Sequence, residues 1–72
     1  MKYQQRIKDL REDKDLLQKE VAEILGIDQR TYSRYENGIN DMPIKHIIKL
    51  CLFYNTSADY ILGLTNKYRT LK

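Results

Sequence analysis

Residues 18–37, with the sequence QKEVAEILGIDQRTYSRYEN, constrain the fold of this chain more than any other segment. Gly26 stands near the centre, where a tight turn needs a residue that tolerates a left-handed backbone. Ala22 is small enough to let a second helix cross closely. Five apolar or aromatic positions are spaced to face a shared interior: Val21, Leu25, Ile27, Tyr32 and Tyr35. The segment therefore predicts two helices that cross through a tight turn.

The second of these helices has two chemically different sides. At 100° per residue, Thr31, Tyr32 and Tyr35 fall on one side. The other side carries polar and basic residues: Gln29, Arg30, Ser33, Arg34 and Asn37. Arginine can pair bidentately with guanine, glutamine and asparagine with adenine, and serine with either base. Any soluble helix shows polar groups to water, but together with the turn pattern this side favours base reading in the major groove of DNA.

Three helices are expected in the first half of the chain. They should span residues 3–13, residues 17 or 18 to 25, and residues 29–36. Ile7 and Leu10 give the first helix its inward side. Gly26 suits the end of the second helix. Asp28 suits the start of the third, because its carboxylate can accept a hydrogen bond from a free N–H there.

Two more helices are expected in the second half. Pro43 suits the first helical position, where a missing N–H costs nothing, and Asn55 suits a left-handed end. The inward stripe between them is predicted as Ile44, Ile47, Ile48 and Cys51. Ser57 is placed to cap the last helix, with Asp59 in its first turn. The apolar side of that helix is predicted as Tyr60, Ile61 and Leu64.

Length and composition narrow the class of protein. Seventy-two residues allow one small domain. One cysteine, Cys51, excludes an intramolecular disulfide and favours a reducing, cytoplasmic setting. No apolar stretch approaches the length of a membrane span, so no membrane association is expected. Residues 1 to 64 hold ten basic and ten acidic side chains, so the net charge of +3 comes from the tail. The acidic stretch from Asp9 to Asp15 should face away from DNA phosphates or lie at the edge of the footprint.

Several motifs together resemble the Cro/repressor-type helix-turn-helix proteins, also called the XRE family. The matching pieces are RIKDLRE, QKEVAEILGID, SRYENG, MP and TSADYILG, which extend from about Arg6 to Leu64. The resemblance implies an all-α, compact five-helix, lambda-repressor-like DNA-binding domain over residues 1–64. Residues 65–72 would be a basic C-terminal tail or the start of a linker. Members of the family generally bind inverted repeats of double-stranded DNA as homodimers, and they are not enzymes.

The resemblance also implies roles for particular residues. Base contacts would come from Gln29, Arg30 and Arg34, with Ser33 touching a base or the backbone. Phosphate contacts would come from Gln18, Asn37 and Asn40. Arg11 and Glu36 would form a structural pair between the first and third helices. This agrees with the physical argument that a guanidinium on an inward face needs a carboxylate partner or water. Two departures from the family pattern are Asp41, where a basic residue would have helped, and Thr56, where an aliphatic residue is usual.

Other site types receive little support. His46 and Cys51 are too few ligands for a metal site, so neither a metal nor a cofactor is expected. No catalytic triad spacing or phosphate-binding loop is present. The last helix and the adjoining end of the fourth, with His46, Phe53 and Tyr54, could form a dimer contact or simply complete the core.

The sequence therefore predicts a transcriptional regulator that represses by occupying promoter DNA. The alternative is a protein-interaction module with the same fold, such as an antitoxin or an anti-repressor target.

Overall fold

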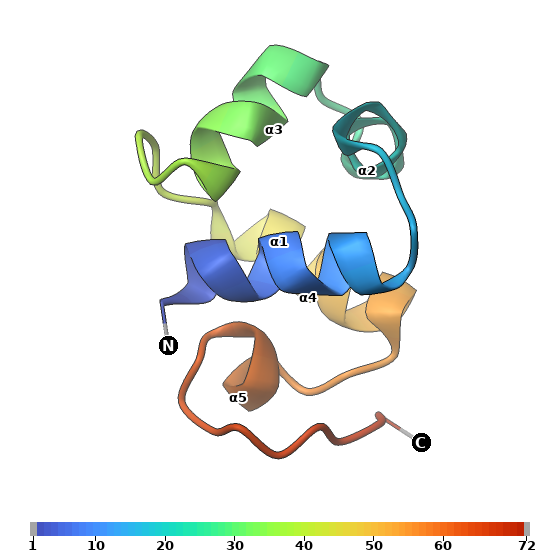
Figure 1. The fold of residues 1–72 in the computed structure, drawn as a ribbon, viewed down its shortest axis with the longest axis vertical. Helices are drawn as coiled ribbons and strands as arrows, with labels where there is room; N and C mark the ends of the chain where they lie inside the picture. Colours follow the sequence, from blue (N-terminus) through green and yellow to red (C-terminus); the bar gives the residue numbers. More distant parts are fainter. Residues whose placement is uncertain (1, 72) are drawn as a thin grey trace.

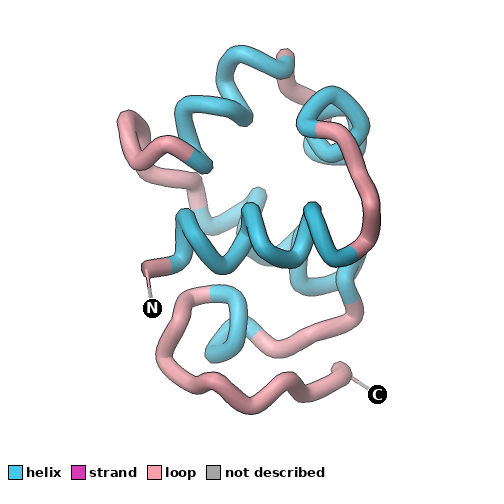
Figure 2. Tube along the Cα trace, in the orientation of Figure 1, coloured by secondary structure: helices cyan, strands magenta, loops and turns pink. Residues whose placement is uncertain are grey.

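The computed structural model describes residues 2–71, which contain five helices and no strand. Their bounds are α1 Tyr3–Asp13, α2 Gln18–Leu25, α3 Gln29–Glu36, α4 Ile44–Tyr54 and α5 Ala58–Ile61. Figures 1 and 2 show helices joined by loops throughout, with α1 lying between α3 and α5. The predicted all-α, five-helix fold is confirmed.

Local sequence signals set most of the helix ends. Gly26 ends α2 with φ of 73°, a left-handed conformation, and Asn55 ends α4 with φ of 52°. Asp28 Oδ1 accepts a hydrogen bond from Thr31 N at 2.8 Å, and this bond lowers the pKa of Asp28. Ser57 Oγ accepts one from Tyr60 N at 3.3 Å. Pro43 stands one residue before α4, rather than at its first helical position as predicted.

The core gathers side chains from all five helices and from the loop before α4. Tyr32, Ile7, Leu50, Ile61 and Val21 are fully buried within it. Ala22 is also buried, in a helix that packs against α3. The predicted inward positions in the first three helices are therefore correct, except that Ile27 and Thr31 are only partly buried.

The inward face of α4 differs from the prediction. Ile47 and Cys51 are buried as expected, but Ile44 and Ile48 are 68% and 54% exposed. Their places in the core are taken by residues of the adjoining arc: His46, Leu50 and Tyr54. Ile44 and Ile48 were predicted to face inward, and His46 was predicted to be a surface or dimer-contact side chain. Both predictions were wrong. Because α4 is apolar around most of its circumference, periodicity alone could not select the buried face.

The corner between α4 and α5 is well packed, although Thr56 stands where related proteins usually have an aliphatic residue. Thr56 is fully buried, and its N–H donates to Cys51 O at 3.0 Å. Its hydroxyl makes no hydrogen bond within the described chain. On the other side of α5, Leu64 is 75% exposed, contrary to the prediction, because α5 ends at Ile61 and the chain turns at Gly63.

Residues 65–71 contain no helix, but they pack back along α5 and the end of α4. Ser57 N donates to Arg69 O at 3.0 Å, and the Tyr68 hydroxyl donates to Tyr54 O at 2.9 Å. The rings of Tyr60 and Tyr68 meet edge to face, with centroids 5.2 Å apart. These contacts were not predicted from the sequence. The domain boundary at residue 64 stays a prediction.

The longest helices, α1 and α4, have 11 residues each. None of the helices between residues 2 and 71 combines the length and the apolar character that crossing a membrane requires.

Candidate nucleic-acid interface

The solvent side of α3 carries the row of polar residues that the sequence predicted. Gln29, Arg30, Arg34 and Asn37 are exposed, and Ser33 is partly buried. On the opposite side, Tyr32 and Tyr35 are buried and fasten α3 to the core. All five polar residues therefore lie on one accessible strip along α3 and its C-terminal end.

The end of this strip is linked by local hydrogen bonds. With its side-chain amide oriented to satisfy both groups, Asn40 accepts a hydrogen bond from Arg34 Nε at 3.1 Å and donates to Ile39 O at 3.2 Å. Ile39 N also donates to Arg34 O at 2.9 Å. In that orientation the Asn40 side chain supports Arg34. Whether Asn40 also contacts phosphate stays a prediction.

Beneath α3, the predicted contact between Arg11 and Glu36 is present. Arg11 Nε donates to Glu36 Oε2 at 2.8 Å and Arg11 Nη2 donates to Oε1 at 3.1 Å, a bidentate pair. Arg11 Nη1 donates to Leu16 O at 2.9 Å. The side chains are 13% and 1% exposed. The pair thus joins α1 to the end of α3 and to the loop before α2.

The charge of Glu36 is stabilised by these neighbours. Burial alone raises the pKa of Glu36, but the hydrogen bonds from Arg11 and Gln18 and the nearby Tyr32 hydroxyl oppose it, and the net pKa is lowered. The same hydrogen bond raises the pKa of Arg11, although burial opposes the change. Burial, followed by the Glu36 carboxylate, raises the pKa of Tyr32. Glu36 is therefore ionised at neutral pH, at the C-terminal end of α3 where a negative charge alone would be unfavourable.

Gln18 belongs to the same network. Its Nε2 donates to Glu36 Oε1 at 3.1 Å, and the residue is partly buried at the start of α2. An amide nitrogen has two N–H groups, so one stays available for another acceptor. Phosphate binding by Gln18 is untested, but the Glu36 contact fixes the amide in one orientation.

Tyr3 helps to hold the loop that follows α3, a role that was not predicted from the sequence. Its hydroxyl accepts a hydrogen bond from Met42 N at 3.0 Å and donates to Asp41 Oδ1 at 3.4 Å. The start of α1 is thereby tied to the loop that follows α3. Asp41, which lies in that loop, thereby has a hydrogen-bond partner on α1.

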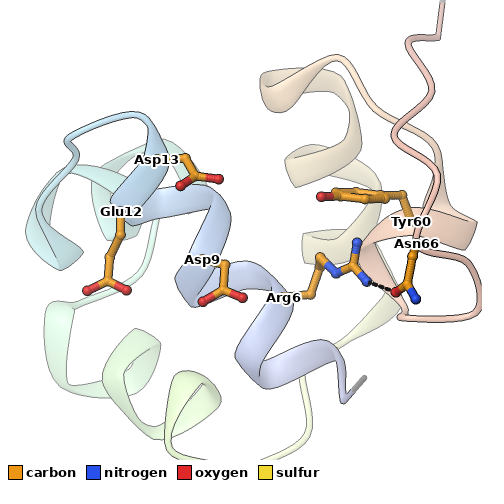
Figure 3. A pocket seen from close by; sticks show the side chains of 6 residues that line it. All are labelled: Arg6, Asp9, Glu12, Asp13, Tyr60 and Asn66. Carbon is orange, nitrogen blue, oxygen red and sulfur yellow. Dashed lines mark hydrogen bonds between the residues drawn. The ribbon is translucent and has the colours of Figure 1, made fainter.

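The acidic residues of α1 lie in a groove shared with α5 and the tail. Figure 3 shows this groove, which is lined by Arg6, Asp9, Glu12, Asp13, Tyr60 and Asn66. Since α1 lies between α3 and α5 (Figure 1), these carboxylates are separated from the polar strip on α3. Arg6, whose burial sequence reasoning missed, donates from Nη2 to Asn66 Oδ1 at 2.9 Å and lies 3.9 Å from the centre of the Tyr60 ring.

Between residues 2 and 71, no group of three or more His, Cys, Asp or Glu side chains is arranged to hold a metal ion. His46 is buried beside Tyr35, with ring centroids 6.1 Å apart. Burial and, to a lesser degree, Lys45 and Lys49 lower its pKa. His46 is therefore a neutral core side chain at pH 7.

Comparison with known proteins decides the family. A helix-turn-helix family model matches residues 7–61, well over half of the chain. The chain belongs to the helix-turn-helix family. The XRE-type resemblance that the motifs predicted is confirmed. In this helix-turn-helix domain, α2 and α3 are the helices that cross at Gly26.

Three curated relatives are longer than the domain that they share with this chain. The HTH-type transcriptional regulator YobD of Bacillus subtilis is 38% identical over 64 residues, or 89% of this chain and 57% of that protein. The antitoxin PezA of Streptococcus pneumoniae is 42% identical, covering 79% and 36%. The CTXphi transcriptional repressor RstR of Vibrio cholerae is 38% identical, covering 72% and 47%. The chain thus spans about half the length of these relatives or less.

A solved structure shares the fold. The crystal structure of a transcriptional regulator from Listeria innocua superposes with a TM-score of 0.84 at 23% sequence identity. The match covers 92% of this chain and 62% of that chain.

Proposed function

We propose that this chain is a sequence-specific DNA-binding transcriptional regulator that represses by occupying promoter DNA. In this proposal α3 enters the major groove, and Gln29, Arg30 and Arg34 contact base edges. Ser33 contacts a base or the backbone, while Gln18, Asn37 and Asn40 contact phosphates. The single observation that carries the proposal is the exposed polar strip on α3, in a chain of the helix-turn-helix family.

The structure around α3 supports this role. The buried Arg11–Glu36 pair and the buried faces of Tyr32 and Tyr35 hold α3 from beneath, so its exposed residues project from a rigid support. The separation of the α1 carboxylates from this strip also removes a source of repulsion with phosphates. Relatives named as transcriptional regulators and as a repressor agree with the proposal.

Two copies are expected on one operator, arranged as an inverted repeat. Residues 1 to 64 are balanced in charge, so one copy alone gains little from nonspecific attraction to phosphates. The domain measures 29 × 22 × 21 Å, and two such bodies side by side can place their α3 helices one DNA turn apart, about 34 Å. Footprinting should therefore protect two half-sites with centres about 10 base pairs apart. Full-affinity protection of a single half-site would contradict the two-copy proposal.

The test of base reading compares Arg30→Ala with Gln18→Ala. Sites are first selected from a random DNA library, and binding is then measured to every single-base variant at two salt concentrations. Arg30→Ala should relax preference at one base position, equivalent to about 1–3 kcal/mol. Gln18→Ala should weaken all sites by a similar factor and barely change the salt dependence, because a neutral phosphate contact reads no sequence.

The matched control is Lys8→Ala, which removes an exposed charge from α1 rather than from the α3 strip. It should leave the ranking of sites unchanged. If Arg30→Ala weakened every variant equally while Gln18→Ala reordered them, α3 would not be the reading element.

A second function is a protein-interaction module, and it is favoured by the similarity to a protein named as an antitoxin. A gel-shift competition against nonspecific DNA separates the two functions. A DNA-reading protein retains its selected site in excess competitor, whereas a module that acts only on proteins shows no preference.

A further inference from the structure

An apolar stripe on α4 is left open to water. Ile44, Ile48 and Leu52 are 68%, 54% and 68% exposed. Their spacing of four residues puts them on one side of the helix, in a row about 12 Å long. We call this row the α4 stripe. Contiguous exposed aliphatic surface of this kind marks a contact surface.

We propose that a second copy of this chain packs on the α4 stripe, with the two α4 helices antiparallel and a two-fold axis passing beside Ile48. This deepens the proposed function, on which it rests for its biological role, because it names the face through which two DNA-bound copies meet. The contact itself is a property of the protein alone.

The spacing of the stripe matches this symmetry. When two antiparallel helices are related by a two-fold axis at Ile48, Ile48 meets its own copy. Ile44 then lies opposite Leu52 of the other copy, and Leu52 opposite Ile44 of the other copy. All three aliphatic side chains find an aliphatic neighbour, as a self-complementary surface requires.

The alternative face, formed by α5 and the end of α4, is partly covered by the chain itself, although Phe53 is 43% exposed. His46 and Tyr54 are buried in the core, at 7% and 4% exposure. Residues 65–71 cover α5 through the Ser57–Arg69 hydrogen bond and the Tyr60–Tyr68 ring contact. A second copy that packed on the side of α5 covered by the tail would displace these contacts, whereas the α4 stripe needs no rearrangement.

The position of α4 also suits a shared DNA site. In Figure 1, α4 runs across the molecule behind α1, while α3 lies at one end of the long axis. A two-fold axis parallel to that long axis makes the two α4 helices antiparallel. It also keeps both α3 helices at the same end of the pair, where one DNA duplex can reach them.

The association is expected to be weak. Three aliphatic side chains per copy bury less than the roughly 1,200 Å² at which specific stable interfaces begin. Lys45 and Lys49 flank the stripe, and the two-fold axis keeps the lysines of both copies on one side of the pair. Lys45 of one copy then lies only about 3 Å along the helix axis from Lys49 of the other. The contact should form at high protein concentration, and at lower concentration on a two-site operator.

The first test is sedimentation equilibrium of the full chain without DNA, over a wide concentration range. The wild-type chain should show concentration-dependent dimerisation. Ile48→Asp should weaken it at least about tenfold, because it sets two carboxylates against each other at the axis. Leu64→Asp is the matched control, since Leu64 is 75% exposed but lies outside the stripe. Equal effects of the two variants, or a wild-type chain that stays monomeric throughout, would overturn the proposal.

The second test uses charge reversal to identify the occupant. Lys45→Glu should strengthen dimerisation several-fold, because each new carboxylate meets Lys49 of the other copy, twice per dimer. If the stripe instead served to bind an acidic partner protein, Lys45→Glu would not strengthen dimerisation of the chain on its own. Unchanged or weakened dimerisation in Lys45→Glu would therefore reject the antiparallel pair.

The third test locates the axis by disulfide formation. In a Cys51→Ala background, Ile48→Cys should cross-link readily under mild oxidation, because the two copies of residue 48 meet at the axis. Leu64→Cys in the same background should not. The reverse pattern would contradict the proposed axis.

DNA binding separates this inference from the proposed function. Ile48→Asp should retain binding to a single half-site and lose the cooperative gain on two half-sites. A dimer that forms through the α4 stripe but binds no DNA would contradict the proposed function only. Full cooperativity in Ile48→Asp would contradict the inference only.

Discussion

Two arginine side chains on α1, five residues apart, are shielded from water by different partners. Arg11 faces α3 and forms a bidentate pair with the carboxylate of Glu36. Arg6 faces α5 and forms no ion pair within residues 2–71. Its guanidinium lies over the Tyr60 ring and donates to the oxygens of Asn66 and Thr65, at 2.9 and 3.4 Å. Its Nε has no hydrogen-bond partner among the residues that the structure describes.

The two arginines therefore stabilise the fold through different kinds of interaction. Arg11 is stabilised by an opposite charge, so the contact between α1 and α3 depends on the ionisation of Glu36. Arg6 is stabilised by a ring face and neutral oxygens, so the contact between α1 and α5 does not depend on any carboxylate. The first contact should be strong and sensitive to acid, and the second weaker and indifferent to acid.

The largest expected loss of folding stability is that caused by Glu36→Ala. It leaves the Arg11 guanidinium largely buried without its counter-charge, and the free energy of unfolding should fall by about 3 kcal/mol. Urea denaturation monitored by circular dichroism measures this loss. Glu23→Ala, at an exposed position of α2, is the control and should change little. A loss below about 1 kcal/mol would mean that the pair behaves like an exposed one.

Acid should reproduce part of this loss. The pKa of Glu36 is lowered from its ordinary value of 4.5, so its ionisation stabilises the fold above about pH 4.5. That stability is lost as the pH falls through the lower pKa of the folded state. Unfolding measured between pH 3 and pH 6 should show a steeper decline in the wild-type chain than in Glu36→Gln. Parallel curves would show that Glu36 is not the group responsible.

A smaller loss is expected for Arg6→Met, which keeps an unbranched apolar stem but removes the guanidinium. The variant loses the ring contact and the hydrogen bonds to Asn66 and Thr65, a cost on the order of 1–2 kcal/mol. Its decline between pH 3 and pH 6 should match that of the wild-type chain. An altered acid profile would show that Arg6 interacts with the α1 carboxylates rather than with Tyr60 and Asn66.

The smallest expected loss of stability is that caused by Tyr60→Leu. This change removes the aromatic ring under the Arg6 guanidinium but leaves the hydrogen bonds of Arg6. The expected loss is about 0.5–1 kcal/mol in the same denaturation experiment. Tyr68→Leu provides a comparison, because it removes the edge-to-face neighbour of Tyr60 without touching Arg6 directly. If Tyr60→Leu cost more than Arg6→Met, the ring would be stabilising α5 chiefly by packing.

The two arginines also show what the sequence could predict. The contact of Arg11 was predictable, because a guanidinium on an inward helical face calls for a carboxylate and the family motif supplies Glu36. Helix ends were predictable at Gly26, Asp28 and Asn55, because caps depend on residues only a few positions apart. The polar strip on α3 followed from helical periodicity alone.

Contacts between distant segments were not predictable in the same way. Arg6 meets Asn66 across 60 positions, and no local pattern marks either residue. Residues 65–71 lack periodicity, so their return along α5 left no signal. On α4, apolar residues occupy nearly every direction, so the buried face was decided by tertiary packing around Leu50 and Tyr54 rather than by the helix itself.

Thr56 shows that the core of this domain has not reached its highest stability. Its hydroxyl is fully buried and makes no hydrogen bond within the described chain, whereas valine has nearly the same shape without a polar group. Thr56→Val should therefore stabilise the fold by about 1 kcal/mol. Surplus stability lets a protein accept destabilising changes elsewhere. A Thr56→Val chain is accordingly the better parent for libraries that vary Gln29, Arg30 and Arg34, since more of their members would stay folded while new base preferences are selected.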